Sequence, residues 1–501
     1  MSIPSLLKSP GELTFQGSPT RLPSVVSLRL PPSKSQLIRR IFIRAVQGQP
    51  FHNTDFDSTW PKDVQDAWSL VQGFFLQRQR GHQEPDDHLW EAGEAGTVMR
   101  FGLAFLVAQG CRGILKGSGR AHERPIGDLV DALVFCGANI EYLAKQGYPP
   151  LKIQPSLLTR RNLRLDAGTS SQFISALVLV APLLGANIDL NENVPWVISC
   201  PAQALSSKPY LEMTVKEMKE AGFFLDNSAN SVRYFSNRPY QVQGLPLRHE
   251  GTENSSFLVE GDWSAASFWI WRQAEVPLCQ HLEVKILTNE SNQADRIILD
   301  LLPLLAPRVS VSFNPDNRSW TIDSLGRDQG LVGKDSDGGH DMATSIVSKS
   351  DGIWRIRATD FPDMVPALAM WALLSGNALE IIGIGHLRYK ESDRIQALMY
   401  NLDLLGIPNG PLALEGIIIT PPSSWKDYSQ RFVTSQGYGQ ISGNSFPVFR
   451  CFGDHRIAMA LSMLALPDLP IPLDEPDVVR KSYPSYWEDW AKFGYTLMSL
   501  N

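Results

Sequence analysis

The stretch SKSQLIRRIFIRA, residues Ser33 to Ala45, holds the pattern that decides the fold of this chain. A short polar turn, Ser33–Ser35, leads into a run where Leu37, Ile38, Ile41, Phe42 and Ala45 recur three and four positions apart. That spacing places the apolar side chains on one face of an α-helix. Serine is a preferred cap for the free amides of a first helical turn. The stretch therefore predicts a helix that begins at a polar turn.

The same pattern occurs six times in the sequence, at intervals of 63 to 99 residues. The other five are Gly96-Thr97 before Val98–Ala108, Ser170-Ser171 before Phe173–Ala181, Gly261–Ser264 before Ala265–Trp271, Asp360–Asp363 before Met364–Leu374, and Gly453-Asp454 before Ile457–Leu466. Ser, Thr or Asp at each start predicts a side-chain cap, and the nearly apolar helices are expected to be buried. Intervals of this length are typical of a repeated structural unit made of strands and helices.

Strand-like segments lie between these predicted helices: Leu151–Gln154, Leu163–Asp166, Val284–Leu287 and Ala378–Ile384. We therefore expect an α/β protein of six similar units.

Length and composition limit the class of protein. The chain has 501 residues, 43% of them hydrophobic and 20% charged, which suits two or three globular domains. Its net charge of -6 argues against broad binding of nucleic acid. No apolar run is long enough for a membrane span, and the first residues lack the apolar core of a secretory signal. We expect a cytoplasmic protein that binds neither nucleic acid nor membrane.

Common catalytic and metal-binding motifs are missing from the sequence. It contains no P-loop, no HExxH and no GxSxG, and its nine histidines form no ligand set, so no metal site is predicted. The five cysteines lie at least 25 residues apart, which excludes a zinc ribbon and makes a disulfide framework unexpected.

Basic residues gather near the predicted helix starts: Lys34, Arg39, Arg100, Arg124, Lys390, Arg394, Arg456 and Lys481. A helix N-terminus carries free amides and a partial positive charge, so nearby cations strengthen its attraction for anions. Each residue alone is better explained by a surface salt bridge. Their recurrence predicts a small substrate with several negative charges, such as phosphates and carboxylates.

Two stretches predict how some of these cations are placed. Pro125 suits a first helical position and Gly137 a helix end, which would put Arg124 at the start of that helix. Lys390 and Arg394 would share one face of a helix. The buried stripe of that helix would be Ile395, Leu398, Leu402 and Leu405, and Gly406 and Pro408 would end it.

Gly81–Asp87, Gly326–Ser350 and Pro421–Ser445 are expected to form surface loops, within insertions that span residues 73–90, 326–350 and 421–445. A break at Gly251–Ser256 marks our expected crossover between domains.

Nine short motifs, in order, resemble one known family. They are Pro32–Ser35 with Arg39, Ala95–Arg100, Glu123–Ile126, Ser170–Phe173, Ser207–Tyr210, Asp360–Asp363, Arg388–Arg394, Asp454–Arg456 and Lys481–Pro484. Together they resemble the 3-phosphoshikimate 1-carboxyvinyltransferase (EPSP synthase) family. One motif alone would be weak, but nine in order from about Leu30 to Tyr486 are specific.

The resemblance implies an enolpyruvyl transferase fold: two domains, each of three βαβαββ units with buried helices, and an active site in the cleft between them. One domain would be discontinuous, residues 1–32 plus 261–501, carrying Asp363, Lys390, Glu391, Arg394, Arg456 and Lys481. The other would be residues 33–260, carrying Lys34, Gly96, Arg124, Ser170 and Gln172. We expect a monomer that needs no cofactor.

The resemblance also implies transfer of the enolpyruvyl group of phosphoenolpyruvate to the 5-hydroxyl of shikimate 3-phosphate. Asp363 would accept a proton, Glu391 would donate one, and Lys34 would assist. Shikimate 3-phosphate would be bound by Lys34, Ser35, Arg39, Ser170, Ser171, Gln172, Ser207, Asp363, His386 and Lys390. Phosphoenolpyruvate would be bound by Lys34, Gly96, Arg124, Gln172, Arg394, Arg456 and Lys481. Glyphosate would take the phosphoenolpyruvate position.

Three residues depart from the family's usual pattern. Glu94 and His386 stand where asparagine is common, and Phe101 stands where proline or leucine is frequent. Glu94 would place a carboxylate near an anion site, whereas a protonated His386 would add a charged bond to phosphate.

Two alternatives stay open at this stage. A sister family transfers enolpyruvyl to a UDP-aminosugar and typically has Asn where this chain has Ser35, as well as a reactive cysteine; Cys111 and Cys136 here suit the core instead. The second alternative is an inactive anion-binding protein that keeps the fold.

Overall fold

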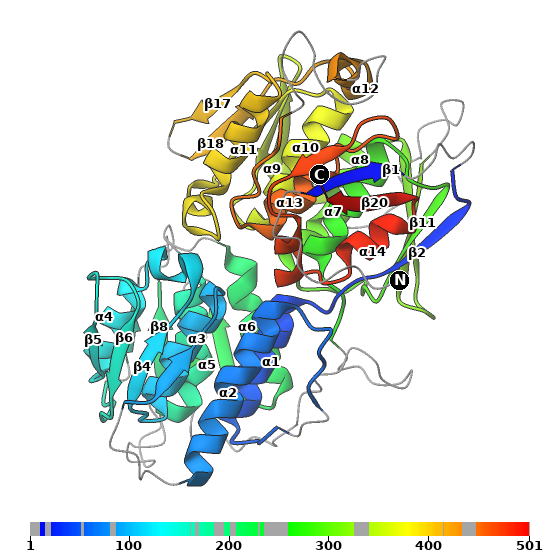
Figure 1. Ribbon diagram of the computed structural model, residues 1–501. Helices are drawn as coiled ribbons and strands as arrows, with labels where there is room; N and C mark the ends of the chain where they lie inside the picture. Colours follow the sequence, from blue (N-terminus) through cyan, green and yellow to red (C-terminus); the bar gives the residue numbers. More distant parts are fainter. Residues whose placement is uncertain are drawn as a thin grey trace. The chain divides into compact units, whose positions relative to one another are not determined.

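The computed structural model describes residues 11–15, 22–51, 55–80, 87–160, 162–165, 170–184, 195–200, 207–228, 231–234, 259–324, 340–413, 415–432 and 447–499. They fall into two compact units. Unit 1 comprises Met1–Pro31, Gly261–Arg388 and Ser392–Asn501, and unit 2 comprises Pro32–Glu260 with Tyr389–Glu391. In Figure 1 unit 2 runs mainly from blue to green, while most of unit 1 runs from green to red. No helix of the described residues is long and apolar enough to cross a membrane.

One supersecondary pattern, strand–helix–strand–helix–strand–strand, builds the two sheets that the described residues of unit 2 form. The first is formed by β3 (Leu89–Glu91), α3 (Gly96–Ala108), β4 (Gly113–Lys116), α4 (Gly127–Cys136), β5 (Asn139–Tyr142) and β6 (Leu151–Gln154). The second is formed by β7 (Asn162–Arg164), α5 (Gln172–Leu184), β8 (Trp196–Ser199), α6 (Lys208–Glu220), β9 (Leu225–Ser228) and β10 (Ser231–Tyr234). The sheet orders are β3-β4-β6-β5 and β7-β8-β10-β9.

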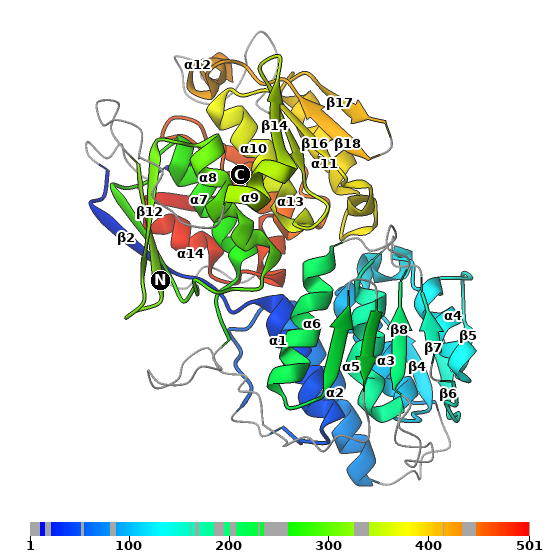
Figure 2. The ribbon, with the colours of Figure 1, turned by 180° about the vertical axis from the view of Figure 1, so that it is seen from behind.

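In both sheets the first two strands are parallel and the last two form an antiparallel hairpin. A parallel pair needs a crossover helix, here α3 or α5, whereas a hairpin needs only a turn. Figure 2 shows β7 and β8 of this parallel pair from behind. The helices α1 (Lys34–Val46) and α2 (Lys62–Arg80) complete the helical part of the unit.

Unit 1 repeats the pattern in three sheets. The first contains β2 (Val25–Arg29), α7 (Trp263–Glu275), β11 (His281–Lys285), α8 (Ile298–Leu305), β12 (Val309–Asn314) and β13 (Ser319–Ser324). The second contains β15 (Ile353–Arg357), α10 (Val365–Ser375), β16 (Leu379–Ile382), α11 (Arg394–Leu404), β17 (Asn409–Leu412) and β18 (Gly416–Ile419). The helix α9 (His340–Ile346) precedes the edge strand β14 (Val347–Ser350) of the second sheet.

The third sheet of unit 1 is closed by the beginning of the chain. Its helices are α13 (His455–Ser462) and α14 (Tyr486–Ala491), and its strands are β19 (Ile471–Leu473), β20 (Tyr495–Ser499) and β1 (Gly11–Phe15). Phe449 bridges in parallel to Leu473, and β1 lies between β19 and β20. The order of strands is therefore the same as in the other four sheets, although its last strand comes first in the sequence. The α/β prediction with repeated units is confirmed.

All six predicted helices are present and buried, as α1, α3, α5, α7, α10 and α13. Four of them, α3, α5, α10 and α7, are mainly apolar, so their burial removes a nearly continuous apolar surface from solvent, whereas α1 also buries Arg39 and Arg40. The prediction of a side-chain cap at every start is wrong. Asp262 and Asp454 cap α7 and α13, but Ser33 makes no such bond at α1 and Ala95 has no side chain able to cap α3.

The expected insertions are partly regular structure. Residues 73–80 continue α2, because Val71 and Phe74 extend its buried stripe. His340–Ser350 forms α9 and β14, and Trp425 begins the short helix α12 (Trp425–Ser429) with its indole bonded to the carbonyl of Leu464. Residues 81–86, 325–339 and 433–446, like the expected crossover at Gly251–Ser256, lie outside the described residues.

Candidate functional site

The start of α1 brings the first predicted cation into unit 2. Ser33 donates its backbone amide to the carbonyl of Glu260, at 2.8 Å, so the chain is fixed there by the backbone rather than by a serine cap. Lys34 is the first residue of the helix, and its ammonium lies 2.9 Å from Asp63 at the start of α2. Since no side chain caps α1, its first-turn amides add a partial positive charge to that of Lys34.

Gly96 and Arg124 form the tightest arrangement in unit 2. Gly96 is the first residue of α3, and a Cβ built there would lie 2.4 Å from Cζ of Arg124. The guanidinium therefore lies directly over the glycine, in space that any other side chain would fill. Arg124 is 9% exposed, and its position over a helix N-terminus suits the binding of an anion.

Arg100 is a functional candidate. It is one of the basic residues near the predicted helix starts, but no binding role was predicted for it. It is buried, donates to Oε1 of Gln172 at 2.5 Å, to the Pro125 carbonyl at 3.1 Å and to Oγ of Ser170 at 3.4 Å. Burial lowers its pKa well below the usual range, and the nearby charge of Arg124 lowers it further. Arg100 thus holds two predicted ligand residues while carrying a charge that is poorly compensated.

Arg39 links two helices of unit 2. Its guanidinium donates to Oγ1 of Thr214 at 2.7 Å, to the Tyr210 carbonyl at 2.9 Å and to the Ser35 carbonyl at 2.7 Å. Burial lowers its pKa to about 10, so it remains charged at neutral pH. Arg39 therefore positions α1 against α6, and its contact with a substrate stays a prediction.

The predicted serines of unit 2 lie at helix starts. Ser170 and Ser171 precede α5, which begins at Gln172, and Gln172 donates to Oγ1 of Thr97 at 2.9 Å. Ser207 precedes α6 in a left-handed conformation, with φ at 56°. Ser171 and Ser207 are both buried, so their hydroxyls lie in a low-dielectric environment where hydrogen bonds are strong.

Unit 1 contains two arginines that meet on one carboxylate. Arg394 donates to Oδ1 of Asp363 at 2.7 Å, and Arg456 approaches Oδ2 of the same residue at 3.4 Å. Asp454 accepts from Nε of Arg394 at 2.8 Å and from the backbone amide of Arg456 at 2.9 Å. Burial opposes ionisation of Arg456, but Asp363 and Asp262 outweigh it and raise its pKa. The arginines are thus held in place by carboxylates.

Asp454 belongs to this cluster but is not among the site residues predicted from the sequence. It is fully buried, accepts a hydrogen bond from Ser392 at 3.0 Å, and caps α13. The signal was present in the sequence, because an aspartate directly before an apolar helix is a cap. Its second role, as the partner of Arg394, arises from a residue sixty positions away and carries no local signal.

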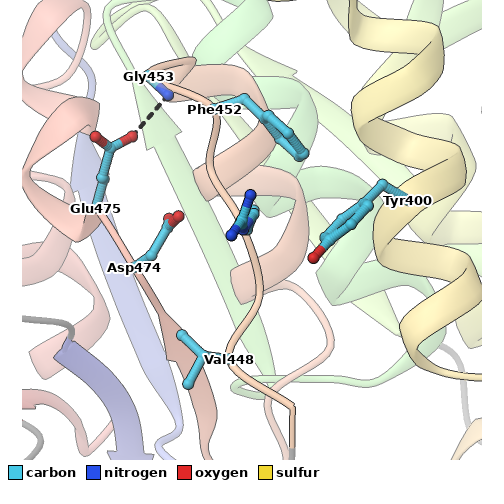
Figure 3. Close-up of a pocket in the computed structure, with 7 residues that line it drawn as sticks. Tyr400, Val448, Phe452, Gly453, Asp474 and Glu475 are labelled. Carbon is cyan, nitrogen blue, oxygen red and sulfur yellow. Dashed lines mark hydrogen bonds between the residues drawn. The ribbon is translucent and has the colours of Figure 1, made fainter.

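The loop before Asp454 is held by hydrogen bonds to the backbone of Gly453. Phe452 and Gly453 have positive φ values of 55° and 64°, and the Gly453 amide donates to Glu475 at 2.7 Å (Figure 3). Lys481, a predicted phosphoenolpyruvate ligand, donates to the Gly453 carbonyl at 2.8 Å. These bonds fix the direction in which the chain enters α13.

A pocket of about 660 Å³ opens beside this loop, lined by Tyr400, Val448, Arg450, Phe452, Gly453, Asp474 and Glu475. The rings of Tyr400 and Phe452 meet edge to face with centroids 5.4 Å apart (Figure 3). None of its lining residues is a predicted site residue. Its two carboxylates serve the backbone of the loop, since Asp474 accepts from the Cys451 amide at 2.7 Å.

Two local predictions are wrong. Helix α4 begins at Gly127 behind Ile126, so Pro125 lies before the first helical position, although Gly137 ends the helix as expected. Helix α11 begins at Arg394 behind its cap Asp393, so Lys390 cannot share a helical face with Arg394. Both helices begin later in the sequence than expected. The stripe predicted for α11 is nevertheless buried.

The remaining predicted residues lie next to α11. His386 is in the 3-10 turn Gly385–Tyr389, and Lys390 and Glu391 follow it. Tyr389–Glu391 group with unit 2, whereas Arg394 belongs to unit 1. Their roles stay predictions.

The departures from the family pattern leave the surrounding structure intact. Phe101 is buried within α3 and contacts Phe42 edge to face at 5.9 Å, and the helix still begins at Gly96. The carboxyl group of Glu94 lies beside Gly119. Neither residue removes a group that the predicted chemistry uses.

Cys111 and Cys136 are unsuited to nucleophilic chemistry. Both are free of disulfides. Burial raises the pKa of Cys136 to about 11 and that of Cys111 to about 12. A thiol with such a pKa is almost entirely protonated at neutral pH and reacts slowly.

Comparison with known sequences decides the family. Residues 72–490 match the family described as EPSP synthase (3-phosphoshikimate 1-carboxyvinyltransferase). The chain belongs to the EPSP synthase family. Among its relatives, the 3-phosphoshikimate 1-carboxyvinyltransferase of Bacteroides fragilis is 29% identical over 405 residues, which cover 80% of this chain and 82% of that one. The enzyme of that name from Aeromonas salmonicida is 30% identical over 404 residues, covering 80% and 77%.

Solved structures confirm the fold. EPSP synthase from Acinetobacter baumannii superposes with a TM-score of 0.62 at 18% identity, covering 98% of this chain and all of that one. The enolpyruvyl transferase NikO from Streptomyces tendae gives 0.57 at 14% identity, covering 98% and 99%. The chain is thus an enolpyruvyl transferase of the EPSP synthase family, which implies small-molecule substrates of the phosphoenolpyruvate and shikimate 3-phosphate type.

Proposed function

We propose that this chain transfers the enolpyruvyl group of phosphoenolpyruvate to the 5-hydroxyl of shikimate 3-phosphate, and so serves the shikimate pathway to chorismate. The observation that carries the proposal is the carboxylate of Asp363 between Arg394 and Arg456. Two guanidiniums on one carboxylate favour its ionised form, which is the form a proton acceptor needs.

The reaction proceeds by addition and elimination. The 5-hydroxyl oxygen attacks C2 of phosphoenolpyruvate while its proton passes to Asp363, and C3 receives a proton from Glu391. The resulting tetrahedral intermediate then loses a proton from C3 and expels inorganic phosphate from C2, which restores the double bond as an enol ether. The elimination moves negative charge onto the departing phosphate, so fixed cations near it stabilise that transition state.

The buried cations supply that stabilisation in the proposal. Phosphoenolpyruvate is bound by Lys34, Gly96, Arg124, Gln172, Arg394, Arg456 and Lys481. Shikimate 3-phosphate is bound by Lys34, Ser35, Arg39, Ser170, Ser171, Gln172, Ser207, Asp363, His386 and Lys390. Arginine suits the carboxylate of phosphoenolpyruvate because its planar fork bonds both oxygens.

The test is the release of inorganic phosphate when the protein is mixed with phosphoenolpyruvate and shikimate 3-phosphate. We expect turnover by the wild-type chain and a loss of about 100-fold or more in Asp363→Asn, because general-base catalysis typically contributes that much. Asp316→Asn, in the exposed turn between β12 and β13, is the matched control and should keep full activity.

Other acceptors define the outcomes that would refute the proposal. The likeness to NikO shows that this fold also occurs in an enolpyruvyl transferase of another name. Phosphate release with UDP-N-acetylglucosamine but not with shikimate 3-phosphate would assign the chain to the aminosugar reaction. Tight binding of phosphoenolpyruvate without release of its phosphate in the presence of any acceptor would leave an anion-binding protein.

A further inference from the structure

Asp295 is a buried carboxylate in the surroundings of Arg456 that neither the family resemblance nor the proposed reaction uses. It lies in the 3-10 turn Ala294–Ile297 and is 1% exposed. The neighbouring Gln293 accepts from the Trp263 amide at 3.1 Å and donates to the Gly261 carbonyl at 2.8 Å. The turn is therefore tied to the start of α7, and Asp295 is held rigidly.

The two oxygens of Asp295 differ in their surroundings. Oδ2 accepts a hydrogen bond from the hydroxyl of Ser264. Oδ1 is buried and has no hydrogen-bond partner among the described residues. Nε of Arg456 is likewise buried and without a hydrogen-bond partner in the described part of the chain. An unpaired buried carboxylate oxygen is costly when it carries charge.

Asp295 belongs to a group with more acids than bases. Its charged neighbours are Asp363 on the 3-10 turn before α10, Arg456 on α13 and Asp262 at the start of α7. With Asp454 and Arg394, which bond to the same residues, the group contains four carboxyls and two guanidiniums. If all were ionised, the group would repel the anion that the proposed function brings to Arg456.

Asp295 is the member of the group best able to take up a proton. Asp363 and Asp454 both accept from guanidinium groups, and Asp262 accepts from the amide of Ala265, so protonation would weaken those bonds. The partner of Asp295 is a hydroxyl, which can accept a hydrogen bond as readily as donate one. Burial, together with the charge of Asp363, raises the pKa of Asp295 to about 7.

We propose that Asp295 is a positioning residue whose proton couples phosphoenolpyruvate binding to pH: it is protonated when the anion is bound at Arg456 and ionised at high pH when the site is free. The inference rests on the proposed function for the identity of the anion. A neutral Asp295 leaves the charge of Arg456 for the ligand, whereas an ionised Asp295 competes for it. Binding above neutral pH therefore takes up a proton.

The first test is the pH profile of kcat/KM for phosphoenolpyruvate between about pH 7 and pH 8.5, where most of the substrate's phosphate is already doubly ionised. We expect the wild-type value to fall by up to tenfold per pH unit, the limit for one coupled proton. Asp295→Asn should remove this slope and change kcat much less than KM. Asp316→Asn, which removes an exposed carboxylate from the same unit, should keep the wild-type slope.

The second test needs no turnover, so it separates this inference from the proposed function. Calorimetric binding of phosphoenolpyruvate to the wild-type chain at pH 8, in two buffers of different ionisation enthalpy, should show uptake of up to one proton. Asp295→Asn should show none. If turnover with shikimate 3-phosphate fails but proton uptake depends on Asp295, the reaction is wrong and the coupling stands.

Stability provides a readout that does not depend on the ligand. The folded chain keeps the proton of Asp295 up to about pH 7, whereas the unfolded chain releases it in the ordinary range of aspartate. The free energy of unfolding should therefore fall as pH rises between these values, and Asp295→Asn should reduce that fall. A wild-type slope and proton uptake unchanged in a folded Asp295→Asn variant, or no uptake by the wild type, would overturn the proposal.

Discussion

Substitution of Gly96 by alanine tests whether the position of Arg124 is what makes unit 2 an anion site. The new Cβ would lie 2.4 Å from Cζ and within 2.6 Å of both terminal nitrogens of Arg124, whereas ordinary contact begins at 3.4 Å. The guanidinium must therefore move by about 1 Å. It can do so because it is the end of a flexible side chain, and alanine is at least as favourable as glycine in a helix. We expect the fold to survive.

The expected effect is on binding of phosphoenolpyruvate. A hydrogen bond to a charged group contributes about 1.5 to 3 kcal/mol, and about 1.4 kcal/mol corresponds to a tenfold change in affinity. Losing the aligned contact of Arg124 should therefore raise KM for phosphoenolpyruvate about 10- to 100-fold. KM for shikimate 3-phosphate should change little, because Arg124 is not among its predicted ligands. Steady-state phosphate release with each substrate varied in turn measures both values.

Two further variants isolate the cause. Gly102→Ala crowds the same helix, but its Cβ meets only Leu70, at 3.0 Å, so it should alter stability and leave KM for phosphoenolpyruvate unchanged. In an Arg124→Lys background the slimmer ammonium avoids the clash, and Gly96→Ala should have a much smaller effect. An equal rise in KM in both backgrounds, or no rise at all, would refute the argument from Arg124.

Three further predictions concern buried charge and cysteine reactivity. Asp454→Asn leaves Arg394 without its buried carboxylate partner and should lower the free energy of unfolding by about 3 kcal/mol in urea titration. Glu217→Gln breaks a buried ion pair in unit 2 and should lower the free energy of unfolding by a similar amount. The side chain of Glu220 is 28% exposed, so Glu220→Gln should lower that free energy by less than about 1 kcal/mol. Because burial raises the pKa of Cys136 to about 11, iodoacetamide at pH 8 should leave activity intact; rapid inactivation that maps to Cys136 would contradict this.

The helices of the fold could be predicted because their signals are local. The run from Leu37 to Ala45 has the spacing of a helix whatever surrounds it, and α1 contains it entirely. The third sheet of unit 1 had no such signal. Its strand β1 pairs with β20, placing Gly11 opposite Ser499, and nothing within Gly11–Phe15 indicates a partner at the other end of the chain.

The site was predictable in its residue types but less so in its pairings. Arg394 and Arg456 were both identified, yet the sequence does not show that they share Asp363 or that Asp454 fixes the first of them. The same limit applies to the turn at Ser33, whose amide bonds to the carbonyl of Glu260, more than two hundred residues away. Capping rules count only local partners, and here a distant carbonyl fixes the turn.

Arg100 in unit 2 and Arg394 in unit 1 lie in contrasting surroundings, and this difference predicts where binding energy arises. In unit 2, burial and mutual repulsion lower the pKa of Arg100 beside Arg124, so an arriving anion relieves a cost already present in the free protein. In unit 1, Asp363 and Asp454 hold Arg394, so an anion must share a guanidinium that is already bonded. The first arrangement favours affinity, and the second favours precise orientation. Removing charge at Arg100 should therefore weaken binding more than turnover, whereas changes at Asp454 should affect turnover more than binding.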